Sequence, residues 1–264
     1  MKQPLVSVIV TTKNNEPIIR RCLQSVIQQS YRHIELIVVD NFSNDRTQEI
    51  SRTFTSLIFS RGPEISAQRN FAAGKAKGDY FFFIDSDMEF LKNVVKDCVE
   101  KINHHAGLVV PEHFIGKGFW TACKILEKSS YTGTDDGIAA RFFPRTIFFQ
   151  LKGYDEALTG PEDIDMHKRV VKLGSVGRSS EFITHDDGRL TLSQIVRKRY
   201  YYSLTLQLYL KKHREVAKRE FRFFRPAYLQ NWKLFARDPA HAAGMLIMRF
   251  LEGLAVLLAL WRQR

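Results

Sequence analysis

Two aspartates separated by one serine, Asp85 and Asp87 in the segment DSDME, are the first candidates for chemistry in this sequence. They follow YFFFID, an apolar run over residues 80–85 that is too short to span a bilayer and is typical of a buried strand. Ligands of open α/β sheets bind beyond the carboxyl ends of the strands. Two hard oxygen donors at that place suit Mg²⁺ or Mn²⁺, which can bridge to substrate phosphates. An isolated pair of this kind is more often an acidic turn that caps a helix.

Two other segments place polar side chains near a second strand end. Asp40 ends the apolar run IELIVVD and opens DNFSNDRT, where Ser43 and its neighbours form a polar turn that can hydrogen-bond a base and a ribose. The same turn is also a capped start of a helix. Arg69 precedes the acid pair and could hold a pyrophosphate with a bidentate contact, although a single arginine is more often a solvated helix residue.

A third group of carboxylates lies further along the chain, in GPEDIDMHKRVVKLG at residues 160–174. Glu162, Asp163 and Asp165 stand at the start of a predicted helix, after a Gly-Pro turn. Acids are favoured there in any protein, because the helix macrodipole stabilises each by roughly 0.3–1 kcal/mol. Their position therefore does not by itself distinguish a catalytic base from a capping residue.

The elements that must position these side chains alternate between strands and helices. Strands are predicted over residues 7–12, 34–40, 56–60 and 80–85, and helices over residues 18–29, 43–54 and 66–76. This alternation indicates a parallel sheet covered by helices. The three cysteines are far apart and lack a CxxC spacing, which favours a reducing compartment over a disulfide framework or a zinc site.

Charge divides the chain into two parts. Residues 189–264 contain sixteen Lys and Arg against four Asp and Glu, which accounts for the whole net charge of +12. Basic side chains there alternate with Tyr, Phe, Trp and Leu, as in helices that lie at an anionic membrane surface. The apolar stretch 240–261 is long enough to span a bilayer, but Arg249 and Glu252 interrupt it and favour a helix lying in the interface or docked on a partner. The alternative is a soluble helix packed on the catalytic domain with both charges outward.

Three segments, in this order and spacing, resemble the family 2 glycosyltransferases with the GT-A fold: SVIVTTKNN, DNFSNDRT and AQRNFAAGKAKGDYFFFIDSD. The resemblance covers roughly residues 4–185. It implies an α/β, Rossmann-like, mixed and mainly parallel sheet flanked by helices, followed by an α-helical C-terminal extension. The expected domains are a catalytic domain over 1–188, with a nucleotide-binding half (1–110) and an acceptor-side half (111–188), and a basic, aromatic-rich, membrane-associating tail over 189–264.

The resemblance also implies roles for individual residues. The nucleotide-sugar contacts expected from it are Thr11, Thr12, Asn14, Asp40, Ser43, Arg69, Asp85 and Ser86. Mn²⁺ or Mg²⁺ is expected at Asp85, Asp87 and His185, with Asp87 as the principal ligand; Asp186 and Asp187 are alternatives to the histidine. Asp163 corresponds to the base of the family's ED motif, and Glu162 to the residue that orients donor or acceptor. Direct attack by the deprotonated acceptor hydroxyl would invert the anomeric carbon.

The expected activity is transfer from a nucleotide diphosphate sugar, UDP first with GDP and dTDP as alternatives, to a lipid-linked glycan or a surface polysaccharide precursor. A polyprenyl-phosphate sugar synthase is the nearest alternative. A nucleotidyltransferase is disfavoured because TTKNNEP has no glycine-rich phosphate loop, and a nucleic-acid-binding protein would leave the catalytic residues unexplained. The N-terminus shows no signal-peptide pattern, so we expect a cytoplasmic, peripheral, monotopic protein on an anionic membrane, with no nucleic-acid partner.

Overall fold

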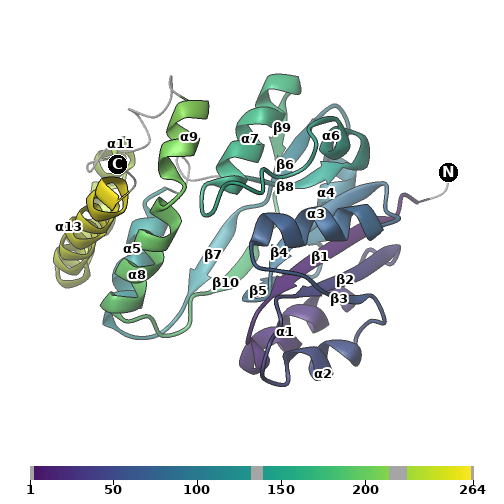
Figure 1. Cartoon of the computed structure of the whole chain (residues 1–264), viewed down its shortest axis with the longest axis horizontal. Helices are drawn as coiled ribbons and strands as arrows, with labels where there is room; N and C mark the ends of the chain where they lie inside the picture. The colour runs from purple at the N-terminus through teal and green to yellow at the C-terminus, as the bar shows by residue number, and fades with distance from the viewer. Residues whose placement is uncertain (1–2, 132–138, 214–224, 263–264) are drawn as a thin grey trace. The chain divides into compact units, whose positions relative to one another are not determined.

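The computed structural model describes residues 3–131, 139–213 and 225–262, which form two compact units (Figure 1). The first unit consists of Met1–His113, Ala139–Glu156 and Glu162–His185. The second consists of Phe114–Ile138, Ala157–Pro161 and Asp186–Arg264. A domain boundary at residue 188 remains a prediction, and the second unit also includes a segment from the middle of the chain.

A seven-stranded sheet runs through the first unit in the order β3-β2-β1-β4-β8-β6-β9. The β1, β2, β3 and β4 strands are parallel to their neighbours within this group, and β8 pairs antiparallel with both β4 and β6. The expected mixed, mainly parallel sheet is therefore confirmed. The strands are β1 (Val6–Thr12), β2 (Ile34–Asp40), β3 (Ile58–Ser60), β4 (Tyr80–Asp85), β6 (Gly107–Val109), β8 (Ala140–Pro144) and β9 (Val176–Arg178).

Helices cover both faces of this sheet, so its central strands are apolar on both sides. Successive residues of a strand point to opposite faces. Val8 and Val10 accordingly belong to one apolar core and Ile9 to the other, and all three are fully buried. The helices of this unit are α1 (Glu16–Ile27), α2 (Thr47–Arg52), α3 (Ile65–Lys75), α4 (Val94–Lys101), α6 (Arg145–Gln150) and α7 (Glu162–Leu173).

The predicted elements agree with the structure except at some ends. β3 begins at Ile58, two residues later than expected, and α2 begins at Thr47, although a helix was predicted from residue 43. Part of the reason for the later helix start is local. Asp45 accepts hydrogen bonds from the backbone N–H of Thr47 (3.0 Å) and from its hydroxyl, which closes a polar turn in front of the helix.

A second, three-stranded sheet has the order β5-β10-β7 and consists of β5 (Met88–Phe90), β10 (Ile183–Asp186) and β7 (Glu112–Ile115). β5 and β10 pair antiparallel, with His185 opposite Met88. β5 follows the DSD segment directly. This register therefore places His185 next to the second aspartate of that segment.

The second unit is helical, as the resemblance implied for the C-terminal extension. Its core contains Cys123, Ile195, Tyr228, Met245 and Met248. Its helices are α5 (Phe119–Ser129), α8 (Leu192–Ser203), α9 (Leu206–Lys212), α11 (Pro226–Gln230), α12 (Trp232–Arg237) and α13 (Pro239–Arg262). A capping box at Thr191 and Gln194 begins α8.

Two charged residues in the middle of α13 point into the second unit. The side chains of Arg249 and Glu252 are 11% and 5% exposed, and both ion-pair within this unit. The outward orientation considered from the sequence is therefore wrong. Apolar side chains occupy the exposed face of α13 in their place: Leu246, Ile247, Phe250, Leu254, Leu257, Leu258 and Trp261.

Candidate active site

The ends of β1 and β4 bring together the first pair of predicted residues. Their parallel register sets Thr11 opposite Asp85, and the Thr11 hydroxyl donates to Asp85 Oδ1 (3.3 Å). The hydroxyl of Thr12, the next residue, is buried and has no hydrogen-bond partner among the described residues. A buried hydroxyl without a partner costs free energy, so this position suits a bound polar group.

Asp85 is held by two arginines. Arg69 Nη2 lies 2.8 Å from Asp85 Oδ1, and Arg141 Nη1 lies 3.6 Å from Asp85 Oδ2. Burial alone would raise the pKa of Asp85, but the two guanidinium groups outweigh it and hold the pKa well below its usual range. The carboxylate is therefore charged at every pH of practical interest.

Arg69 connects the aspartate at the end of β4 with the acid pair at the start of α7. It projects from α3, is almost fully buried, and its Nη1 lies 3.4 Å from Glu162 Oε1. Its guanidinium also lies over the ring of Tyr154, 5.1 Å from the ring centroid. Three residues predicted from separate parts of the sequence, Arg69, Asp85 and Glu162, thus form one cluster, in which Arg69 and Glu162 are buried and Asp85 is partly exposed.

The Glu162 and Asp163 carboxyl groups titrate unusually. Burial and the charge of Asp163 raise the pKa of Glu162 to about 7, and Glu162 Oε2 is buried without a hydrogen-bond partner among the described residues. Burial also raises the pKa of Asp163, while Arg141 and Arg69 oppose this. Asp163 is thus within electrostatic reach of the same cluster. A carboxylate whose pKa lies closer to neutral is better suited to accept a proton.

Asp87, the second aspartate of the DSD segment, lies next to His185. His185 Nε2 lies 3.4 Å from Asp87 Oδ2, and His185 Nδ1 lies 2.7 Å from Glu112 Oε2. Burial would lower the pKa of His185, but the hydrogen bonds to Asp87 and Glu112 outweigh it and raise the pKa to about 9. Arg141 holds Glu112 in turn, with its Nη2 2.7 Å from Glu112 Oε1.

The donor set at Asp87 and His185 fits a divalent metal. Asp87 Oδ1 is buried and has no hydrogen-bond partner among the described residues. A histidine whose second ring nitrogen contacts a carboxylate is also the usual arrangement of a metal-bound imidazole. Asp85 differs, since arginines and Thr11 engage its oxygens. Over the described part of the chain, no three His, Cys, Asp or Glu side chains are already grouped as a metal site.

The remaining nucleotide contacts predicted from the sequence belong to two interlocked turns. Asp40 Oδ2 accepts from the Ser43 N–H (2.8 Å) and from Gln48 Nε2 (2.7 Å). Asn14 donates its N–H to the Ser43 hydroxyl (2.7 Å) and accepts from the Asn44 N–H (2.8 Å). These bonds join the turn after β1 to the turn after β2, so Asn14, Asp40 and Ser43 lie together.

Ser86, the last of the predicted nucleotide contacts, lies between the two aspartates of the DSD segment. Its hydroxyl accepts from Asn15 Nδ2 (2.6 Å), and its N–H donates to the Thr11 carbonyl (3.2 Å). The serine therefore fixes the DSD segment against the end of β1.

Three residues of the site were not predicted. Arg141 contacts Asp85 and Glu112, Glu112 holds His185, and Tyr154 packs on Arg69. An arginine inside the apolar run ARFFP is the one signal that could have indicated Arg141. Glu112 carries no motif, and Tyr154 lies in the half of the catalytic domain (111–188) that was expected only to face the acceptor.

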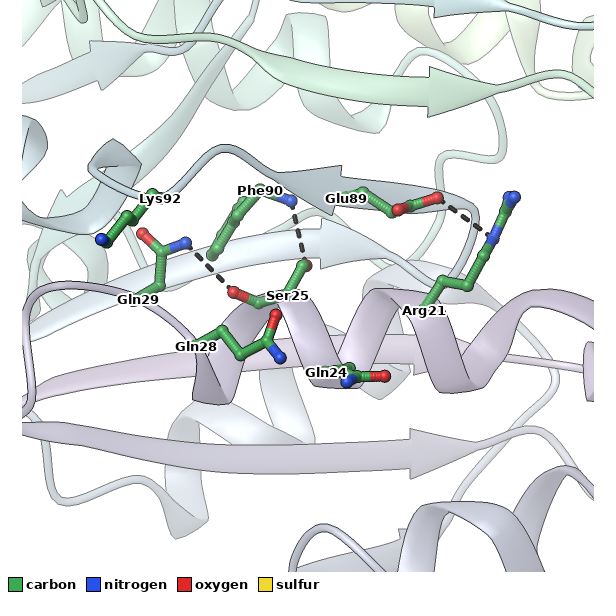
Figure 2. A pocket seen from close by; sticks show the side chains of 8 residues that line it. All are labelled: Arg21, Gln24, Ser25, Gln28, Gln29, Glu89, Phe90 and Lys92. Carbon is green, nitrogen blue, oxygen red and sulfur yellow. Dashed lines mark hydrogen bonds and ion pairs between the residues drawn. The ribbon is translucent and has the colours of Figure 1, made fainter.

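A cavity of about 510 Å³ lies elsewhere in the first unit, between α1 and β5 (Figure 2). Its lining includes Arg21 and Glu89, which form an ion pair at 3.2 Å, and Ser25, which accepts from the Phe90 N–H (3.0 Å). None of the predicted site residues lines this cavity. It is therefore separate from the candidate active site.

The sequence model of the family described as "Glycosyl transferase family 2" matches residues 7–155, which is more than half of the chain. The chain belongs to glycosyl transferase family 2. Thr11, Asp40, Arg69, Asp85 and Asp87 lie within the matched region, and the acid pair of α7 and His185 lie beyond it.

Glycosyltransferases of several bacteria are similar to this chain. Glycosyltransferase GlyA of Streptococcus pneumoniae is 32% identical over 116 residues, which cover 41% of this chain and 17% of GlyA. The GalNAc(5)-diNAcBac-PP-undecaprenol beta-1,3-glucosyltransferase of Campylobacter jejuni is 28% identical over 155 residues, covering 53% of this chain and 49% of that protein. The matched region thus spans less than half the length of these relatives.

Solved structures show the same fold. Mannosyltransferase PcManGT from Pyrobaculum calidifontis, in complex with GDP-Man and Mn²⁺, has a TM-score of 0.67 at 16% identity, covering 100% of this chain and 89% of that one. S. aureus TarS 1–349 in complex with UDP-GlcNAc has a TM-score of 0.55 at 19% identity, covering 89% and 76%. At these identities the likeness concerns the fold, which is the GT-A-like arrangement expected from the sequence.

Proposed function

We propose that this family 2 member transfers a sugar from a nucleotide diphosphate sugar to an acceptor hydroxyl, with inversion at the anomeric carbon. The observation that carries the proposal is the bridge made by Arg69, which lies 2.8 Å from Asp85 and 3.4 Å from Glu162. Through this arginine, the carboxylate at the nucleotide-binding edge and the acid pair of α7 share one cluster. Family membership leaves the nucleotidyltransferase and nucleic-acid-binding alternatives without support.

The acid pair supplies the base in this mechanism. Asp163 accepts the proton of the acceptor hydroxyl, and the oxygen attacks the anomeric carbon opposite the departing diphosphate. Glu162 orients the reacting groups. Its carboxylate is negatively charged and becomes neutral when it binds a proton. Burial raises the pKa of Asp163, which increases its basicity, while Arg69 and Arg141 keep the charged form accessible.

Asp87 and His185 would hold Mn²⁺ or Mg²⁺, with Asp85 as the third predicted ligand. Such an ion, when bound, neutralises charge that develops on the diphosphate leaving group. Arg141 supports this arrangement by holding Glu112, which in turn orients the His185 ring. The nucleotide sugar is bound at the ends of β1, β2 and β4 by Thr11, Thr12, Asn14, Asp40, Ser43, Arg69, Asp85 and Ser86.

The donor and the acceptor are proposed from chemistry and from the neighbours. PcManGT is in complex with GDP-Man and TarS with UDP-GlcNAc, so both nucleotides are candidates, with UDP first and dTDP as a further one. The Campylobacter relative is named for an undecaprenol-diphosphate-linked acceptor. We propose a lipid-linked glycan or a surface polysaccharide precursor as acceptor, and synthesis of a polyprenyl-phosphate sugar as the alternative.

Membrane association is proposed from α13. This helix is long and apolar enough to cross a bilayer. One of its faces is buried in the second unit through Met245, Met248 and Ala255, and the opposite face exposes large apolar side chains such as Phe250 and Leu257. A helix with one face docked and one face apolar suits peripheral, monotopic binding to the cytoplasmic surface of an anionic membrane.

A donor-binding panel tests the proposed activity. UDP-, GDP- and dTDP-sugars are added to the full chain with and without Mn²⁺, and the melting temperature is measured, since a ligand that binds only the folded state raises it. We expect one nucleotide to raise it only with metal, and Asp87→Asn to abolish the response. Glu100→Gln, on an exposed stretch of α4, is the control. A response to no nucleotide sugar, or one that survives Asp87→Asn, would contradict the proposal.

A further inference from the structure

The second unit contains a buried cluster of charged side chains that the proposed transfer reaction does not use. Lys124 of α5 lies 2.9 Å from Glu127 and 3.1 Å from Glu252 of α13. Arg249, also on α13, lies 3.4 Å from each of the two carboxylates. The side chains of Glu127 and Glu252 are 3% and 5% exposed, so these ion pairs lie in the interior of the unit.

The carboxylates of this cluster are well satisfied. Glu127 accepts hydrogen bonds from the hydroxyl groups of Tyr131 (2.8 Å) and Tyr228 (3.2 Å), besides its contacts with Lys124 and Arg249. Burial would raise the pKa of Glu127, but Lys124 and Arg249 outweigh it and lower the pKa to about 2. Glu127 is therefore a charged carboxylate with no need of a further cation.

The arginines are not satisfied in the same way. The Nε of Arg199 on α8 is buried and has no hydrogen-bond partner among the described residues. Burial lowers the pKa of Arg199, and the positive charges of Arg249 and Arg225 lower it further. The charges of Glu252 and Glu127 oppose this change by raising the pKa, but do not outweigh it. Arg225 lies 4.9 Å from the centroid of the Tyr131 ring, and its Nε is also buried without an acceptor.

The charges of the cluster do not balance. In the described chain, Lys124, Arg199 and Arg249 interact with only two carboxylates, Glu127 and Glu252, and Arg225 adds a fourth positive charge. The buried Nε atoms of all three arginines lack an acceptor among the described residues. A network that served packing alone would pair its buried charges, because an uncompensated one costs several kcal/mol. An anion with several acceptor oxygens would compensate these positive charges.

We propose that Arg199, Arg225 and Arg249 form a binding site for a phosphate or diphosphate group, distinct from the nucleotide-sugar site. Guanidinium groups match the oxygens of phosphate in geometry and charge. The site belongs to the unit that carries the exposed apolar face of α13, so the phosphate of a lipid head group and free phosphate share the required chemistry. The proposal does not depend on the chain being a glycosyltransferase.

The test uses inorganic pyrophosphate in EDTA, so that no divalent metal can support nucleotide-type binding in the first unit. Melting temperatures of the full chain are compared for the wild type, Arg199→Gln and the matched control Arg197→Gln. Arg197 is exposed on the same helix, so the control removes the same charge outside the cluster. At about 100-fold excess over Kd, pyrophosphate should raise the melting temperature of the wild type and the control by about 5–10 °C. Arg199→Gln should lose this response.

The ligand-free proteins give a second readout. Arg199→Gln removes an uncompensated buried charge, so without pyrophosphate its melting temperature should equal or exceed that of the wild type. A lower value would identify Arg199 as a structural ion-pair partner and overturn the proposal. Equal pyrophosphate responses in all three proteins, or no response in the wild type, would overturn it too. If Arg199→Gln fails to fold, the same comparison is made with Arg225→Gln, which lies at the start of α11.

Vesicles distinguish the two sources of phosphate. Phosphatidylcholine vesicles with and without phosphatidic acid are sedimented with each protein. Weaker sedimentation of Arg199→Gln than of Arg197→Gln assigns the site to a lipid phosphate, provided that pyrophosphate, by competing for the site in Arg197→Gln, abolishes the difference. Equal sedimentation together with a lost pyrophosphate response assigns it to free phosphate. UDP binding with Mn²⁺ is measured on the same variants and should be unchanged, so failure of the donor proposal and failure of this one give different results.

Discussion

Replacing Glu162 with glutamine should make the protein more stable, and more so at alkaline pH. The carboxyl group is 8% exposed, its Oε2 has no hydrogen-bond partner among the described residues, and Asp163 lies next to it. Burial and the charge of Asp163 raise its pKa from 4.5 to about 7. Between these two values the folded protein binds more protons than the unfolded chain, so stability falls as the pH rises.

The magnitude follows from the pKa. A difference of one in pKa corresponds to about 1.4 kcal/mol, so the change from 4.5 to about 7 limits the effect to about 3 kcal/mol. Between about pH 5.5 and about pH 8.5, the free energy of unfolding of the wild type should fall by about 2 kcal/mol, and that of Glu162→Gln should not show this fall. The two carboxyls titrate as a pair, and removing the charge of Asp163 lowers the pKa of Glu162. Asp163→Asn should therefore reduce the pH dependence as well.

Urea denaturation at the two pH values measures this difference. Far-UV circular dichroism is the appropriate signal, because all three tryptophans lie in the second unit and their fluorescence would report that unit. Glu100→Gln, whose side chain is 63% exposed, removes the same charge from the surface of the first unit and should change nothing with pH. If the stability difference between Glu162→Gln and the wild type were the same at both pH values, the desolvation argument would be refuted.

Four further outcomes are expected. Asp163→Asn should lower kcat by about 10²–10⁴-fold and leave donor binding intact; a rate near that of the wild type would exclude Asp163 as the base. Asp87→Asn should weaken Mn²⁺ binding measured by calorimetry, and an unchanged affinity would remove Asp87 from the metal site. Glu112→Gln should weaken Mn²⁺ binding about 10–100-fold by releasing the His185 ring, and a change in KM for the acceptor alone would argue against this role. Leu257→Asp, on the exposed face of α13, should reduce sedimentation with anionic vesicles, whereas undiminished sedimentation would place the membrane contact elsewhere.

The strands that carry the site could be predicted from local pattern. The apolar runs ending in Asp40 and Asp85 became β2 and β4, because a strand buried on both faces must be continuously apolar and its first polar residue marks its end. Parallel pairing then brings Thr11 opposite Asp85 and Thr12 opposite Asp40. The position of the sheet edge proposed to bind the nucleotide therefore followed from the order of strands and helices.

The start of α2 could not be predicted from local sequence pattern. DNFSND contains several residues that favour helix starts equally, and propensity alone could not choose among them. The structure uses Ser43 to hold Asp40 and Asn14, which keeps these residues out of the helix. A tertiary contact between two turns thus decided the boundary.

By itself, the sequence determined the fold class, the family and the carboxylates at the strand ends, because these depend on residue types at short spacing. Only the tertiary structure decided that Arg141 reaches Asp85, because β8 inserts antiparallel between β4 and β6. It also decided that Glu112 holds His185, because β7 and β10 are neighbours in the three-stranded sheet. It also turned Arg249 and Glu252 inward. Such contacts depend on which strands and helices become neighbours, and residues far apart in the chain carry no local pattern that records this.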